Sequence, residues 1–87
     1  MVMKSGRIQK TDRVCWYQND QLHRLDGPAQ EWANGGKFWY QNGLCHRLDG
    51  PAIEYADGTK CWYFRGQQIE CTDQIQFERM LRLKAFW

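Results

Sequence analysis

The sequence contains no run of 18 or more apolar residues and no pair of cysteines spaced C-x-x-C. The first absence argues against a transmembrane helix, and the second leaves neither a thioredoxin-type motif nor a zinc-ribbon spacing. Residues 1–10 also lack the apolar centre of a secretory signal. We therefore expect a soluble, cytoplasmic protein without membrane contact, in which the four cysteines are free thiols.

Large rings supply much of the apolar material. Aromatic residues make up 15% of the 87 residues, with five tryptophans and four tyrosines, whereas the mean hydropathy is −0.79. A chain of this length forms one domain and buries only about 60% of the surface that its unfolded form exposes. A few large rings in a polar chain suit a thin sheet better than a thick globule.

The net charge of +2 is unevenly distributed along the chain. Both ends are basic, whereas residues 14–73 carry five basic and eight acidic side chains. This balance argues against a sheet surface that follows phosphates, so any nucleic-acid contact would use the ends. The N-terminal cluster is either a solvated tail or a basic docking site. Its members are Lys4, Arg7, Lys10 and Arg13.

The chain repeats itself with a period of 23 residues. At this offset the Trp-Tyr pair at 16–17 aligns with the pairs at 39–40 and 62–63, and the block H-R-L-D-G-P-A at 23–29 is identical to that at 46–52. The third copy lacks the block and has Ile69 in place of the histidine. Terminal repeats of stacked arrays commonly degenerate in this way, because they cap the array.

Turn residues divide each repeat into short strands. Asn42-Gly43 is a strong hairpin signal, and Asn19-Asp20 and Arg65-Gly66 hold the equivalent positions. The D-G-P segments interrupt the chain again, because proline cannot donate to an inner ladder. Since every link is short, we expect a meander in which each strand pairs with its sequence neighbours. The expected strands lie near 13–18, 21–24, 29–33, 37–41, 44–47, 52–55, 60–64 and 67–71.

The last residues change to a helical pattern. Asp73 is a suitable N-cap with Gln76 three residues later, and the apolar residues from Phe77 to Trp87 follow at helix-like spacing. We expect a helix from about 74 to 85 that covers one sheet face or the last strand's edge.

The 23-residue period, the N-G-x-x-H turn and the D-G-P-A block resemble MORN-type repeats, in the branch that includes the YwqK-like antitoxin-associated proteins. The resemblance covers about residues 11–71. The H-R-L-D-G-P-A block, closed by a helix, is similar to small repeat proteins of bacteriophages and prophages. Arg and Leu replace the usual MORN glycine at 24, 25, 47 and 48, so the lipid-head-group roles of some eukaryotic MORN proteins are not carried over.

Residues and resemblance together predict a mainly β fold: a single-layer antiparallel meander of about three MORN-like hairpin repeats with a C-terminal α-helix. The expected parts are a basic N-terminal tail (1–10), a β-repeat domain (11–71) and an amphipathic helix (72–87) packed on the same domain. The resemblance implies a protein-binding module, active in the host bacterial cytoplasm, that modulates or inhibits a host protein or defence complex. It supplies no catalytic residues and implies no cofactor.

The pairs His23/Asp26 and His46/Asp49, with Cys45 beside one of them, could be acid–base pairs or metal ligands. A catalytic site needs one convergent set of groups, whereas these recur at the repeat spacing. Each aspartate is better explained as a cap of its own turn. We therefore predict no catalytic residues, no metal site and no enzymatic activity.

The tryptophan row could form a stacking platform for single-stranded nucleic acid, or the core beneath the helix, which we favour. Arg24 and Arg47 could anchor an acidic partner or pair with Glu31 and Glu54. The candidate partner-binding residues are Trp16, Tyr17, Arg24, Trp39, Tyr40, Arg47, Trp62 and Tyr63. The leading hypothesis is binding to a host protein. The alternatives are nucleic-acid association through the basic termini and aromatic rows, and homo-oligomerisation through free edge strands.

Overall fold

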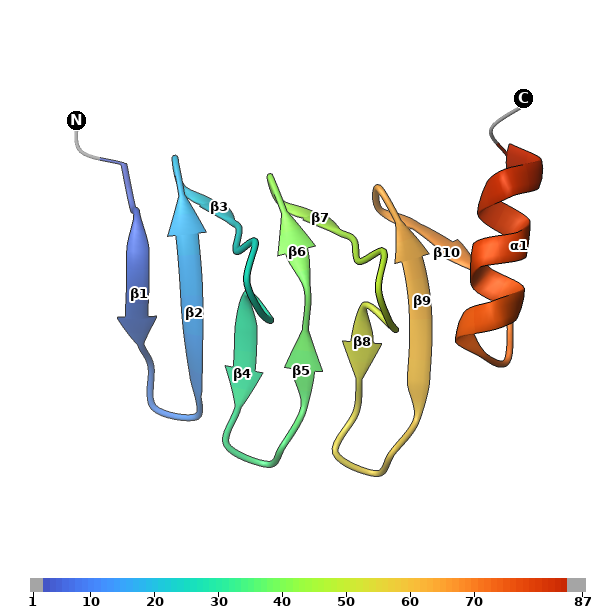
Figure 1. Cartoon of the computed structure of the whole chain (residues 1–87). Coiled ribbons are helices and arrows are strands. Elements are labelled where there is room, and N and C mark those ends of the chain that lie inside the picture. The colour runs from blue at the N-terminus through green and yellow to red at the C-terminus, as the bar shows by residue number, and fades with distance from the viewer. Residues whose placement is uncertain (1–2, 85–87) are drawn as a thin grey trace.

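The computed structural model describes residues 3–84, which form a mainly β fold closed by one C-terminal helix (Figure 1). Eight strands make an antiparallel sheet and two more form a separate hairpin, so the predicted fold class is confirmed. The strands are β1 (Gly6–Gln9), β2 (Arg13–Gln18), β3 (Gln21–Leu22), β4 (Gln30–Trp32), β5 (Lys37–Phe38), β6 (Tyr40–Gln41), β7 (Leu44–Cys45), β8 (Ile53–Glu54), β9 (Lys60–Phe64) and β10 (Gln67–Ile69), and the helix is α1 (Gln74–Lys84).

The strand order corrects one expectation. Within residues 3–84, β3 and β4 are neighbours in sequence but do not pair with each other; instead both pair with β2. β4 lies along the first half of β2, and β3 lies along the second half. The H-R-L-D-G-P block between them contains the proline, which cannot donate to a ladder. The chain therefore leaves the sheet after β3 and returns as β4 beside the first half of β2.

The second repeat is built in the same way. β5 and β6 are two halves of one extended segment, with β8 paired to the first half and β7 to the second. Backbone bonds then join one repeat to the next: the Gly43 N–H donates to Leu22 O at 2.9 Å, and 23 residues later the Gly66 N–H donates to Cys45 O at 2.8 Å. The sequence repeat is therefore a repeat of hydrogen bonds between neighbouring units.

The three hairpin turns have the backbone conformation that their residues favour. Both central residues of each turn have positive φ: 51° and 65° at Asn19-Asp20, 51° and 79° at Asn42-Gly43, and 48° and 84° at Arg65-Gly66. Such turns match the right-handed twist of the strands they connect. The predicted hairpin positions are thus confirmed.

The N-terminus departs from the expected tail. Gly6–Gln9 form β1, which pairs with β2 over its whole length. The segment before it is also attached, because the Lys4 N–H donates to Asp20 Oδ1 and Ser5 Oγ accepts a bond of 3.4 Å from the Asn19 N–H. The sheet therefore begins before the repeat does.

Helix α1 begins as predicted, with Asp73 Oδ1 accepting a bond of 2.8 Å from the Gln76 N–H. Its Phe77 ring is fully buried against Trp62 and Ile69. A second cluster around Cys45, Ala52 and Ile53 lies within the sheet. The expected contribution of Trp87 lies outside the described residues. In residues 3–84 no helix is both long and apolar enough to cross a bilayer.

Candidate protein-binding surface

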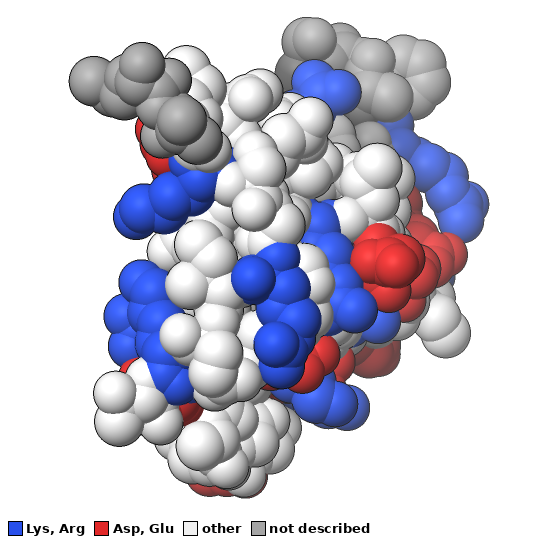
Figure 2. Space-filling model, turned by 90° about the vertical axis from the view of Figure 1, so that its left-hand side faces the viewer, with Lys and Arg blue, Asp and Glu red and all other residues white. Residues whose placement is uncertain are grey.

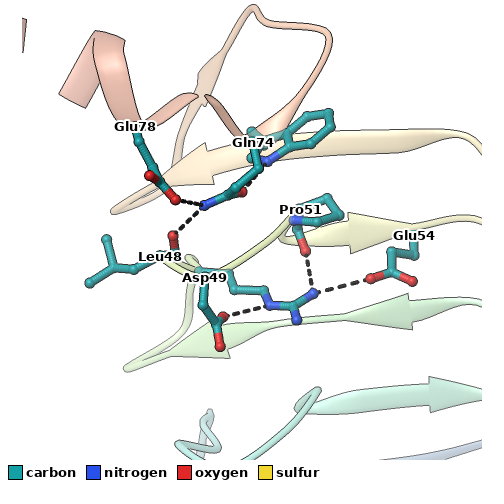
Figure 3. Close-up of polar contacts among 8 residues, drawn as sticks. Leu48, Asp49, Pro51, Glu54, Gln74 and Glu78 are labelled. Atoms are coloured by element: carbon teal, nitrogen blue, oxygen red, sulfur yellow. Dashed lines mark hydrogen bonds and ion pairs between the residues drawn. The ribbon is translucent and has the colours of Figure 1, made fainter. Parts of the chain in front are cut away.

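Arg47 is the centre of a polar cluster that holds one H-R-L-D-G-P loop in place (Figure 3). Its guanidinium carbon lies 3.9 Å from the centre of the Trp39 ring. Nε donates to Asp49 Oδ1 at 2.9 Å, and Nη1 donates to Pro51 O at 3.0 Å and to Glu54 Oε2 at 3.1 Å. The arginine thus ties the start of the loop to its end and to the adjoining strand.

Arg24 makes the same set of contacts one repeat earlier. Its guanidinium carbon lies 3.8 Å from the centre of the Trp16 ring, and the guanidinium bonds Asp26 at 3.0 Å, Pro28 O at 3.1 Å and Glu31 at 3.4 Å. Of the two roles considered for these arginines, the structure shows the pairing with Glu31 and Glu54. The Trp16 and Trp39 rings are each covered on one side by a cation.

The glycine of each block is explained by the same cluster. A Cβ atom on Gly50 would lie 2.6 Å from the Arg47 guanidinium carbon, and one on Gly27 would lie 3.0 Å from that of Arg24. The Arg47 guanidinium would have to shift if residue 50 carried a side chain, whereas a shift of a few tenths of an ångström in Arg24 would make room at residue 27. The hydrogen bond from Arg47 to Asp49 also lowers the pKa of that carboxyl below its ordinary value.

Trp62 has a different cover from Trp16 and Trp39. Only 6% of it is exposed, beneath Phe77 of α1. Its Nε1 donates to Gln74 Oε1 at 2.8 Å, while Gln74 Nε2 donates to Leu48 O and to Glu78 Oε2, both at 2.9 Å (Figure 3). The helix therefore replaces the missing third arginine and also attaches to the preceding loop.

The two histidines join neighbouring repeats. His23 Nδ1 accepts a bond of 2.9 Å from the Asn42 N–H, and His46 Nδ1 accepts an equal bond from the Arg65 N–H. Burial, helped by the charge of Arg65, lowers the pKa of His46. Burial also raises the pKa of the adjacent Cys45 thiol to about 12, so this thiol is protonated at neutral pH.

The histidines and aspartates therefore make structural hydrogen bonds within or between repeats, and Cys45 is buried among them. Within the described part of the chain, no group of three or more His, Cys, Asp or Glu residues is placed to hold a metal ion. All four cysteines are free thiols.

A groove of about 460 Å³ lies between the two H-R-L-D-G-P loops. Its lining includes Trp39, His46, both arginines, Leu25 and Leu48. These leucines are 76% and 56% exposed. Sequence reasoning missed them as site residues, although an apolar residue repeated within a turn-rich block was a usable signal.

The other candidates lie apart from this groove. The sheet register places Tyr17 opposite Gly6 and Trp16 opposite Arg7. Neighbouring residues of a strand point to opposite faces, so the tyrosines lie on the face away from the tryptophans. The Lys4 and Lys10 ammonium groups stand 5.0 and 5.7 Å from the centre of the Tyr17 ring. The eight candidate residues therefore do not form one site.

The basic docking residues follow β1 and its turn. Figure 2 views the molecule from this side and shows several Lys and Arg side chains among uncharged residues, with acidic side chains gathered toward the right. Arg13 is the exception, because it pairs with Asp12 at 2.7 Å and lies over Trp32, 4.7 Å from the ring centre.

No protein-family model, no curated protein and no solved structure matches this chain.

Proposed function

We propose that this chain is a non-enzymatic protein-binding module of phage or prophage type, which modulates or inhibits a host protein in the bacterial cytoplasm. The main support for this proposal is that Leu25 and Leu48 are exposed at equivalent positions along one groove. Burial of a leucine side chain stabilises a folded or bound state by roughly 1.5–3 kcal/mol. Folding leaves both leucines exposed, so a partner that covers them would gain this free energy. Apolar side chains around a groove with a polar rim are typical of interaction sites.

The rigidity of the loops supports this proposal. Arg24 and Arg47 each bond the first and last parts of their own loop and stack on a tryptophan. A partner would therefore meet loops that are already ordered, which reduces the entropy lost on binding. The carboxylates of Asp26 and Asp49 beside the leucines are already paired with Arg24 and Arg47, so the leucines favour a partner surface with an apolar centre.

The phage or prophage origin and the host target rest on the resemblance of the H-R-L-D-G-P-A block. The nucleic-acid alternative receives less support, because arginines cover Trp16 and Trp39 and helix α1 covers Trp62. Bases need an open ring face on which to stack.

The test is an affinity purification from bacterial lysate with and without nuclease treatment, with the double variant Leu25→Ser/Leu48→Ser as the probe of the groove. The matched control is Ile75→Ser, since Ile75 is 68% exposed on α1 and does not line the groove. We expect a stoichiometric protein with the wild type and the control, and at least a fivefold weaker interaction with the double variant. Equal recovery by all three proteins, or recovery lost with nuclease, would contradict the proposal.

A further inference from the structure

One side of the sheet is open. Within residues 3–84, β1 pairs with β2 alone, so its outer edge has no partner strand. At the opposite end of the sheet, α1 lies beside β10 (Figure 1). Natural sheets usually protect a free edge or use it to bind another strand.

The pairing shows which backbone groups face outward. The Lys10 N–H donates to Arg13 O at 2.7 Å, so Lys10 directs its backbone groups toward β2. Backbone groups of alternate residues in a strand point to the same side. Ile8 therefore also faces β2, whereas the N–H and C=O groups of Arg7 and Gln9 point away from the sheet. These four groups match the pattern that an added strand requires.

Basic side chains predominate along this edge, where, within residues 3–84, the one carboxylate bonded to its backbone is that of Asp20, which accepts from the Lys4 N–H. Lys4 and Arg7 are exposed and Lys10 is partly exposed, and the Asp12 carboxylate beside them is already paired with Arg13. Lys4 and Lys10 stand over Tyr17 on one face of the sheet, whereas Arg7 lies opposite Trp16 on the other. Cations thus flank the edge on both faces (Figure 2).

We propose that β1 binds an extended acidic segment of a partner protein, which adds to the sheet as a further strand. The backbone of the segment pairs with Arg7 and Gln9, and its alternating side chains meet Lys4 and Lys10 on one face and Arg7 on the other. A second copy of this chain fits less well, because its own β1 would bring the same positive charges together. A nucleic acid fits less well, because it has no strand backbone to pair.

This surface is separate from the groove between the loops, so each can be tested alone. The probe is a blocked peptide of paired glutamates separated by single valines, so that both faces of the added strand carry glutamate. It is titrated into isotope-labelled protein while backbone amide signals are followed by NMR. We expect the signals of Arg7 and Gln9 to shift and their hydrogen exchange to slow. Binding should weaken as salt increases.

The matched control peptide replaces each glutamate with lysine and should leave both amides unchanged. Equal shifts with the two peptides, or no shift at either amide, would overturn the proposal. Displacement of the acidic peptide from these amides by an oligothymidylate would overturn it in favour of a nucleic acid. Signal broadening that grows with protein concentration alone would do so in favour of self-association.

Two variants of one residue isolate the backbone contact. Gln9→Pro removes an outward N–H that β2 does not use, and an edge strand tolerates proline. Gln9→Ala keeps this N–H and removes only the side chain, which donates to Lys10 O at 2.9 Å. We expect Gln9→Pro to weaken peptide binding about five- to tenfold and Gln9→Ala to change it less than about twofold. Equal affinities would overturn the proposal.

The wild-type amide shifts decide the question alone if Gln9→Pro does not fold. Gln9→Pro should leave the interaction that depends on Leu25 and Leu48 intact. Loss of peptide binding therefore separates this proposal from the proposed function.

Discussion

His46 Nδ1 accepts a hydrogen bond of 2.9 Å from the backbone N–H of Arg65, in the hairpin turn of the following repeat. His23 makes the same bond to Asn42. Each histidine thus satisfies a turn amide that belongs to another repeat. Nδ1 can accept only while it carries no proton, so this link requires the neutral ring.

We predict that acid weakens the fold through His46. Its pKa is lowered in the folded protein, so the unfolded chain binds the proton first. This contribution to the free energy of unfolding is complete above the ordinary pKa near 6.5, and it is lost as pH falls from there through the lowered pKa. Urea denaturation at a series of pH values measures the effect.

The control for this prediction is His46→Gln, because an amide oxygen can accept the Arg65 N–H without titrating in this range. The pH dependence between about 7 and 5 should be smaller in this variant. An unchanged pH dependence would show that His46 is not the group responsible.

Removal of the Arg47 side chain should destabilise the fold. Arg47→Ala loses the stacking on Trp39 and the bonds to Asp49, Pro51 and Glu54. We expect a loss of about 2 kcal/mol in the free energy of unfolding, because the cluster is partly exposed and its ion pairs are screened. Arg47→Lys should recover little, since lysine lacks the planar fork. The exposed Arg79→Ala is the control and should change stability by less than about 0.5 kcal/mol.

The close approach of Gly50 to Arg47 predicts coupled effects. Gly50→Ala places a methyl group where the guanidinium carbon would be 2.6 Å away, so the arginine must move and lose its contacts. We expect a cost of up to about 2 kcal/mol in the wild type and almost none in the Arg47→Ala background. A double-mutant cycle of urea denaturation measures the coupling. Additive costs would show that the glycine serves another purpose.

Much of the framework can be predicted from the sequence, because it depends on local chemistry. The N-G type turns, the Trp-Tyr alternation and the Asp73 cap each follow from a few adjacent residues. The joint pairing of β3 and β4 with β2 could not be predicted in this way. It depends on where the D-G-P block sends the chain, and short links alone suggested pairing between sequence neighbours.

The candidate site was less predictable than the fold. The identity of the two blocks identifies Arg24 and Arg47 as important, but it does not distinguish a partner anchor from an internal brace. That distinction depends on distances across the fold, such as the 3.1 Å between Arg47 Nη1 and Glu54 Oε2. Strand β1 was not predicted because Gly6–Gln9 lie outside the repeat. As a partly charged edge strand, this segment also lacks the alternation of apolar and polar residues that identifies a strand in a sequence.

The helix should be essential because it covers the last tryptophan. Phe77 is fully buried and packs on Trp62 and Ile69, so Phe77→Ala should cost about 3–5 kcal/mol, the range for a large ring removed from a core. The matched control is Ile75→Ala, two residues before Phe77 on the same helix. Because Ile75 is 68% exposed, this variant should cost less than about 1 kcal/mol. Urea denaturation followed by tryptophan fluorescence measures both. A domain of this size has only about 5 kcal/mol to lose, so Phe77→Ala should be largely unfolded at room temperature. If Phe77→Ala were as stable as Ile75→Ala, the sheet would not depend on α1 to close its final repeat.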